Sequence, residues 1–157
     1  MRRGGLRSAV LVLASCLVAL GAGKSRHVEV LADFEAASDG GAAVVVSLMP
    51  RSASYKVNET PAPRLALGAD QQVLEDRQPP ASTKYEPYDP ETARYLNPEK
   101  PVRFAVAIAA GAPKGIQIVP AKVTFFYCSS TEGWCRRGTE DIEIIVRVGS
   151  PEGAPVS

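Results

Sequence analysis

Apolar and polar residues alternate with a period of two along much of the chain, which is the pattern of half-buried β-strands. The first such segment covers residues 27–34. A turn cluster follows at residues 38–41, and a continuous apolar run at residues 42–49 predicts a second, well-buried strand. These two segments predict a β-hairpin. The side chains of its first strand that would face a core are Val28, Val30, Ala32 and Phe34.

Shorter strand patterns occupy the middle of the chain. Residues 55–58 predict a short strand or a bulge, and residues 65–67 and 72–74 predict two weaker strands. Pro61 and Pro63 impose an extended connection between the first two, because each proline fixes its own φ angle and restricts the residue before it.

The alternation stops between residues 75 and 101, where six prolines exclude both a helix and a central strand. A connection of this length inside a small domain is uncommon, and an ordered one is typically a lid or a binding loop. Three tyrosines lie in it, and each has a large apolar ring with a polar tip. We therefore expect an ordered flap that packs onto the surface. Its candidate contact residues are Tyr85, Tyr88 and Tyr95.

The strongest alternation lies in the C-terminal third. Residues 102–109 predict one strand. Residues 116–119 lead through Pro120 into a further strand at residues 122–128, and residues 139–148 are its hairpin partner. Because proline cannot donate to a ladder, Pro120 is expected at an edge or a bulge. The chain thus shows seven or eight short strands and no convincing helix. This pattern predicts an all-β fold, an immunoglobulin-like antiparallel β-sandwich.

The first 23 residues have the composition of a signal peptide. Three arginines open the segment, residues 8–20 are almost wholly apolar, and residues 21–23 are small. The apolar run is shorter than the roughly 20 residues that span a bilayer. We therefore expect a leader at residues 1–23, one domain at residues 24–148 and a flexible Gly- and Pro-rich tail at residues 149–157.

Residues 13–16 offer a second processing site, because Leu-Ala-Ser-Cys resembles the lipobox of bacterial lipoproteins. Cys16 would then be lipidated and would attach the domain to a membrane. We favour export without a lipid, since residues 17–20 continue apolar where a mature lipoprotein usually turns polar. The expected location is the periplasm or another exported one, with membrane attachment only through Cys16.

The net charge and the single histidine argue against nucleic-acid binding, metal binding and histidine-dependent catalysis. Removing residues 1–23 takes away three of 18 basic residues and none of 17 acidic ones, which leaves a net charge of −2 and argues against a nucleic-acid partner. His27 is the only histidine, and we expect it to be solvated at the start of the first strand. No metal-ligand cluster and no Ser/His/Asp or Cys/His set can be assembled around it, so we expect no metal and no other cofactor.

Cys128 and Cys135 form an even pair in an exported chain, where oxidation is the default state. Cα atoms that face each other across an antiparallel pair are about 4.5–5.5 Å apart, which is within bonding range. A disulfide closing so short a loop would stabilise the fold by about 2.5 kcal/mol on the chain-entropy model. Spacing alone leaves open whether this bridge is only a structural staple or takes part in redox chemistry.

The residues around this pair resemble a known family. Val123 to Tyr127, then Cys128, then Gly133-Trp134-Cys135 are similar to the N-terminal domain of the bacterial thiol:disulfide interchange protein DsbD. The resemblance extends to Pro101-Val102 and to residues 115–119. Residues 55–59 and 61–63 are similar to a related cysteine-bearing domain of proteins with thioredoxin-like and NHL-repeat modules. Six residues separate the cysteines here, one more than is usual in the DsbD family.

The resemblance implies a function. Cys128 and Cys135 would be the exchanging pair of a thiol:disulfide interchange protein, with a thioredoxin-like or membrane thiol-disulfide protein as the partner. Tyr85, Tyr88 or Tyr95 would supply the aromatic cap that shields the pair in the family. Gly133 and Trp134 would contact the partner at the hairpin tip or cover the disulfide. Arg136 and Arg137 would favour a thiolate by their positive charge. The alternative is a non-catalytic binding or structural module with a stapling disulfide.

Overall fold

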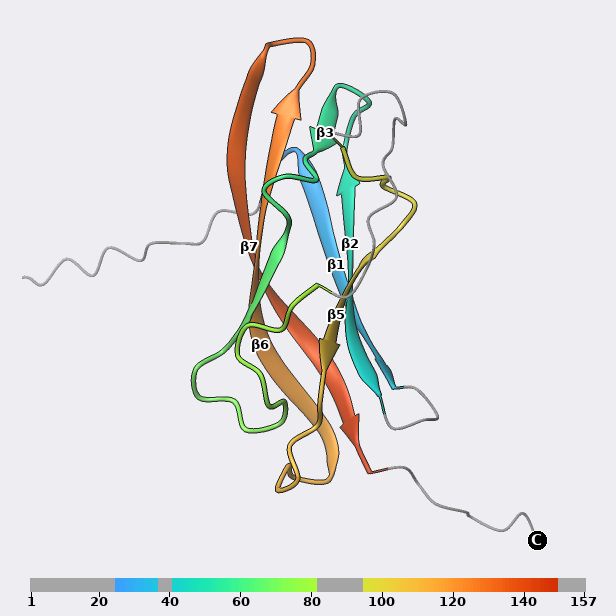
Figure 1. Ribbon diagram of the computed structural model, residues 1–157, viewed down its shortest axis with the longest axis vertical. Helices are drawn as coiled ribbons and strands as arrows, with labels where there is room; N and C mark the ends of the chain where they lie inside the picture. Colours follow the sequence, from blue (N-terminus) through green and yellow to red (C-terminus); the bar gives the residue numbers. More distant parts are fainter. Residues whose placement is uncertain (1–24, 37–40, 82–94, 150–157) are drawn as a thin grey trace, which may run out of the picture.

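The computed structural model describes residues 25–36, 41–81 and 95–149, and these residues form seven β-strands (Figure 1). None of the described residues forms a helix long and apolar enough to cross a membrane. The leader with Cys16, the tyrosines Tyr85 and Tyr88, and residues 150–157 lie outside the described residues. The strands are β1 Val28–Ala36, β2 Ala42–Pro50, β3 Tyr55–Val57, β4 Arg64–Leu67, β5 Val102–Val106, β6 Gly115–Ser129 and β7 Trp134–Val148.

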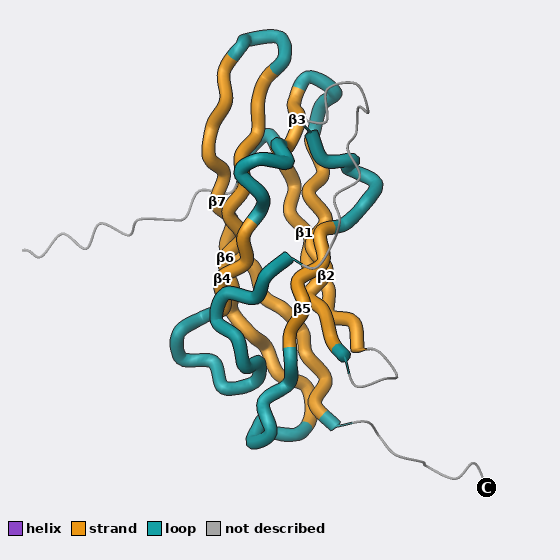
Figure 2. The backbone as a smooth tube through the Cα atoms, viewed as in Figure 1, coloured by secondary structure: helices purple, strands orange, loops and turns teal. Residues whose placement is uncertain are grey.

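The strands form two antiparallel sheets that pack face to face (Figure 2). One sheet has the order β1-β2-β5. In the other, β6 is central, with β7 along one side and with β3 and β4 sharing the other side. If β3 and β4 count as one interrupted strand, these orders are A-B-E and C-F-G of an immunoglobulin domain without strand D. The predicted immunoglobulin-like antiparallel sandwich is confirmed.

The first hairpin forms as its alternation predicts. β1 and β2 pair along their whole length, from Val28 opposite Pro50 to Ala36 opposite Ala42. Val28 is buried, and the other predicted inward side chains of β1 are half-buried against the core. β2 is buried more completely because it is the central strand of its sheet.

The hairpin of β6 and β7 is the longest element of the fold, with 15 paired positions on each strand. β6 runs without a break through Pro120, whose carbonyl accepts a hydrogen bond of 2.8 Å from the Gly68 N–H. In an antiparallel strand, the backbone nitrogen and the carbonyl of one residue point to the same neighbouring strand. For Pro120 that neighbour is β4, which ends at Leu67, the register partner of Ala121. The missing N–H of Pro120 therefore falls at an edge, as expected.

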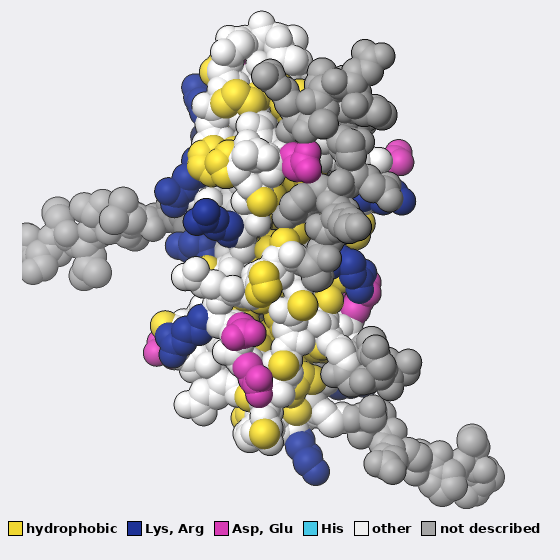
Figure 3. Space-filling view, in the orientation of Figure 1, with side chains coloured by type: hydrophobic (Ala, Val, Ile, Leu, Met, Phe, Trp, Pro, Cys, Tyr) yellow, Lys and Arg dark blue, Asp and Glu magenta, His cyan; other side chains and the backbone are white. Residues whose placement is uncertain are grey.

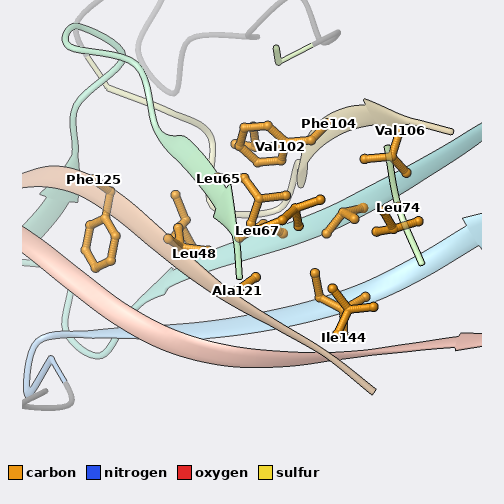
Figure 4. Close-up of a cluster of buried hydrophobic side chains, with 14 of the residues drawn as sticks. Leu48, Leu65, Leu67, Leu74, Val102, Phe104, Val106, Ala121, Phe125 and Ile144 are labelled. Atoms are coloured by element: carbon orange, nitrogen blue, oxygen red, sulfur yellow. The ribbon is translucent and has the colours of Figure 1, made fainter. Parts of the chain in front are cut away.

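The two sheets enclose one core, to which both contribute large apolar side chains (Figure 4). Phe104 of β5 and Phe125 of β6 are among the largest fully buried side chains. The loop residues Val73 and Leu74 also join this core. The labelled members in Figure 4 are Leu48, Leu65, Leu67, Leu74, Val102, Phe104, Val106, Ala121, Phe125 and Ile144.

The weak strand predicted at residues 72–74 does not form. Leu74 makes one isolated bridge with Ile108, and the side chain of Gln71 takes the backbone groups that a ladder would use. Its Oε1 accepts hydrogen bonds from the N–H groups of Val73 and Leu74, at 2.9 and 2.8 Å, and its Nε2 donates to the Leu74 carbonyl at 2.7 Å. This local turn competes successfully with strand pairing.

Candidate functional site

The predicted disulfide is present and joins β6 to β7 close to the loop of their hairpin. Cys128 and Cys135 are direct cross-strand partners, with Cα atoms 4.0 Å apart. One further pair, Ser129 and Trp134, closes the ladder before the loop, which lies at one end of the molecule (Figure 1). Gly133 in this loop has a φ angle of +70°, a conformation that glycine adopts without a steric penalty. The disulfide therefore lies next to the loop at the end of a long, fully paired hairpin.

The disulfide lies on the outer face of its sheet. Successive side chains of a strand point to opposite faces, and Val123, Phe125 and Tyr127 of β6 face the core. Cys128 therefore points away from the core, as does Cys135 opposite it. The two cysteines differ in access, because Cys128 is 8% exposed and Cys135 belongs to the exposed residues. Cys135 is therefore the more accessible of the two cysteines.

Asn58 is the polar neighbour of the buried sulfur. Its N–H donates a hydrogen bond of 2.8 Å to the Phe126 carbonyl, which holds the residue beside β6. Its side-chain Oδ1 lies 3.2 Å from Cys128 Sγ. A disulfide sulfur carries no hydrogen, so this is a contact in the oxidised protein. After reduction, a Cys128 thiol can donate to Oδ1, and the amide, turned over, can donate an N–H to a thiolate.

Tyr95 is the tyrosine of the expected flap that the structure describes, and it lies next to Asn58. The two residues form an isolated antiparallel bridge, and the Leu96 N–H donates to the Val57 carbonyl at 2.9 Å. The ammonium group of Lys56, which is the register partner of Cys128 on β3, lies 5.3 Å from the centre of the Tyr95 ring. Tyr95 is therefore the neighbour of Asn58, the residue whose side chain contacts Cys128 Sγ.

Trp134 lies on the inner face of the hairpin, opposite to the face of the disulfide. Its ring packs against His27 and Tyr127, with ring centres 5.6 and 5.7 Å apart, and its Nε1–H donates to Glu132 at 2.6 Å. The guanidinium group of Arg136 lies 4.3 Å from the centre of the Trp134 ring. Neither Trp134 nor Arg136 is therefore directed at the sulfur atoms, whereas Arg137, two residues after Cys135, is on their face.

The expectation that His27 is solvated is wrong. Three aromatic rings surround it, those of Tyr55 at 4.4 Å between ring centres, Trp134 at 5.6 Å and Tyr127 at 5.8 Å. Its Nδ1 is buried and has no hydrogen-bond partner among the described residues. His27 precedes β1 directly, so it closes this end of the core by packing.

An Asn58→Asp substitution tests whether Asn58 controls the reactivity of Cys128. The variant places a carboxylate about as close to the sulfur as the amide oxygen is now, and a like charge disfavours a thiolate. In a Cys135→Ser background, we expect alkylation of Cys128 by iodoacetamide to require a pH higher by about one unit. The measurement is the alkylation rate as a function of pH.

Asn97→Asp is the matched control for this variant. Asn97 follows Tyr95 by two residues, and its Oδ1 accepts the Glu99 N–H at 2.9 Å, a role that an aspartate also fills. The control should leave the pH profile unchanged. Equal profiles for Asn58→Asp and the parent would mean that the amide does not act on the sulfur.

The fold and the site define a class: an immunoglobulin-like sandwich that carries a cross-strand disulfide near the tip of the hairpin formed by β6 and β7. Within the described ranges, no group of three or more His, Cys, Asp or Glu side chains could hold a metal ion. A comparison with models of known protein families gives no match, and a comparison with curated protein sequences gives none either.

Proposed function

We propose that this protein is an exported thiol-disulfide interchange domain related to the N-terminal domain of DsbD, and that Cys128 and Cys135 are its exchanging pair. The observation that carries the proposal is the unequal access of the two cysteines. Cys135 is exposed at the end of the hairpin, while Cys128 is nearly buried with a polar side chain 3.2 Å from its sulfur. One sulfur is thus open to attack, and the other has a partner when it leaves.

The exchange proceeds in two balanced steps. A thiolate of a partner dithiol attacks Cys135 Sγ, the bond to Cys128 breaks, and Cys128 leaves as a thiolate that then takes up a proton. The second thiolate of the partner attacks the partner sulfur of this mixed disulfide and releases Cys135. The partner is oxidised to its disulfide, and the domain receives two electrons and two protons. The expected partner is a thioredoxin-like or membrane thiol-disulfide protein.

A purely structural role for the disulfide is the alternative. The ladder of β6 and β7 already aligns 15 residue pairs, and the hairpin end is also held by the rings around Trp134. A bridge across a loop of six residues adds about 2.5 kcal/mol to such a hairpin. This contribution is small beside the packing of the core strands, and it does not require one sulfur to be exposed.

The reduction potential of the couple tests the proposal. We expect equilibration with glutathione, followed by trapping with an alkylating reagent, to give a value well above about −300 mV, below which structural disulfides usually lie. The circular dichroism of the reduced protein should stay that of a β-sandwich. A bridge that only excess dithiothreitol opens, with unfolding as it opens, would assign the disulfide to a structural role.

A further inference from the structure

Three cations lie close to the disulfide on the outer face of the β3-β4-β6-β7 sheet, in its own row and in the two rows away from the hairpin loop. Three consecutive rows of residues cross this face near the hairpin end, and the register defines them. They contain the cations of Lys56, Arg64 and Arg137 and no acidic residue. The rows are Lys56, Cys128 and Cys135; Asn58, Phe126 and Arg137; and Arg64, Thr124 and Thr139.

On this face of the sheet, acidic residues enter the rows that follow, farther from the disulfide. In the next row, Lys122 forms an ion pair with Asp141 at 3.4 Å, and Glu143 follows beside Pro120. The space-filling view shows the same division (Figure 3). Lys and Arg side chains gather on the left over the upper half of the molecule, and Asp and Glu accompany them on that side lower down.

Two of these cations line a hollow of about 330 Å³, which begins in the row next to the disulfide. Neither Arg64 nor Arg137 forms an ion pair with a residue in the part of the chain that the structure describes. The hollow has room for one side chain of a partner and combines two guanidinium groups, a hydroxyl group and an apolar wall. Its lining residues are Pro61, Ala62, Arg64, Thr124, Phe126 and Arg137.

The hollow lies close enough to Cys135 for one bound peptide to reach both. Arg137 follows Cys135 by two residues on the same face, which corresponds to about 7 Å along a strand. In an extended peptide, the side chain of a residue one or two positions from a cysteine can lie at a similar distance from the cysteine sulfur. Guanidinium groups bind carboxylates through paired, charge-assisted hydrogen bonds. A peptide whose cysteine attacks Cys135 can therefore place a neighbouring carboxylate between the two arginines.

We propose that the Arg64–Arg137 hollow selects thiol partners with an acidic side chain next to the reactive cysteine. This inference rests on the proposed interchange function and adds to it the kind of protein partner that the site prefers. The hollow acts on the first step, formation of the mixed disulfide with Cys135, because only there does the partner cysteine lie beside Arg137.

Two synthetic peptides test the inference. They have one cysteine each and differ only in an aspartate or an asparagine two positions after it. We expect the aspartate peptide to form the mixed disulfide with the oxidised protein about ten times faster, a ratio that corresponds to about 1.4 kcal/mol. The preference should shrink in 1 M salt, where the Debye length falls to about 3 Å. Mass spectrometry of acid-quenched samples measures the adduct.

Arg64→Gln and Arg137→Gln should each reduce the preference, and the double variant should abolish it. Arg147→Gln is the matched control, because Arg147 lies on the same face of β7 at the opposite end of the strand. It should keep the full preference. All four variants alter exposed side chains, so their melting temperatures should equal that of the parent.

The outcomes separate this inference from the proposed function. Equal rates for the two peptides, with both forming the adduct, would overturn the acidic preference and leave the interchange function in place. A preference that survives in the double variant would also overturn it. A disulfide that neither peptide nor glutathione opens would remove the interchange function, and this inference with it.

Discussion

The Cys128→Ser variant should form a mixed disulfide with a peptide–thionitrobenzoate conjugate at least about ten times faster than the Cys135→Ser variant. In the first variant, the remaining thiol is that of Cys135, which is exposed near the hairpin tip. In the second, it is that of Cys128, which is 8% exposed and has Asn58 against its sulfur. The absorbance of the released thionitrobenzoate measures both rates.

Each variant is the control for the effect of disulfide loss on stability in the other, because both lack the disulfide. Both should lose about 2.5 kcal/mol of stability on the chain-entropy model, and thermal melts should show similar shifts. A difference in capture rate then reports access and not folding. Equal rates, or faster capture by Cys128, would contradict the proposed roles of the two sulfurs.

Gly138→Ala should destabilise the sandwich by about 1–3 kcal/mol, the usual cost of overpacking a core. Gly138 is the register partner of Phe125, and a methyl group at this position would meet the Cε2 and Cζ atoms of that ring at 2.5 Å. The ring is fully buried, so it cannot swing into solvent to make room. The measurement is the free energy of unfolding from urea titration.

Gly111→Ala is the control for this substitution, since nothing lies within 4 Å of the position that its methyl group would occupy. It should change stability little, and it can raise stability by restricting the unfolded chain. Phe125→Leu in the Gly138→Ala background should recover part of the loss through a coupling energy of about 0.5–3 kcal/mol. Independent, additive effects of the two substitutions would mean that the ring and the glycine do not share this space.

The strand pattern of the chain was predictable because half-buried strands repeat every two residues. The alternation at residues 27–34, 102–109 and 139–148 locates β1, β5 and most of β7. The pattern failed at residues 72–74, where a side-chain amide satisfies the backbone. The pattern also missed the first five residues of β7. The strand begins at Trp134, but hydrophobicity does not alternate before residue 139.

The site was predictable only in part. The spacing of Cys128 and Cys135 predicted their disulfide, and the same alternation could have shown that Trp134 and Arg136 face inward. They share the parity of Ile144 and Val146, which are fully buried, whereas Cys135 and Arg137 have the opposite parity. Of the two arginines after Cys135, only Arg137 therefore lies on the face of the disulfide.

Asn58 and Arg64 could not be found from the sequence, because each lies more than 50 residues from the cysteines along the chain. Pairing of β3 and β4 along one side of β6 brings them to the face of the disulfide. Their nearest sequence neighbours give no sign of this, since an asparagine or an arginine in a short strand is ordinarily a solvated side chain.

By itself, the sequence determined the β class, the hairpins and the cysteine pair, because these depend on local periodicity and on short loops. Only the tertiary structure decided which side chains accompany the disulfide: Asn58 at the buried sulfur, Arg64 and Arg137 around the hollow, and His27 within the aromatic rings. The physical reason is that strand pairing joins residues distant in sequence, and its register decides which of them share a face.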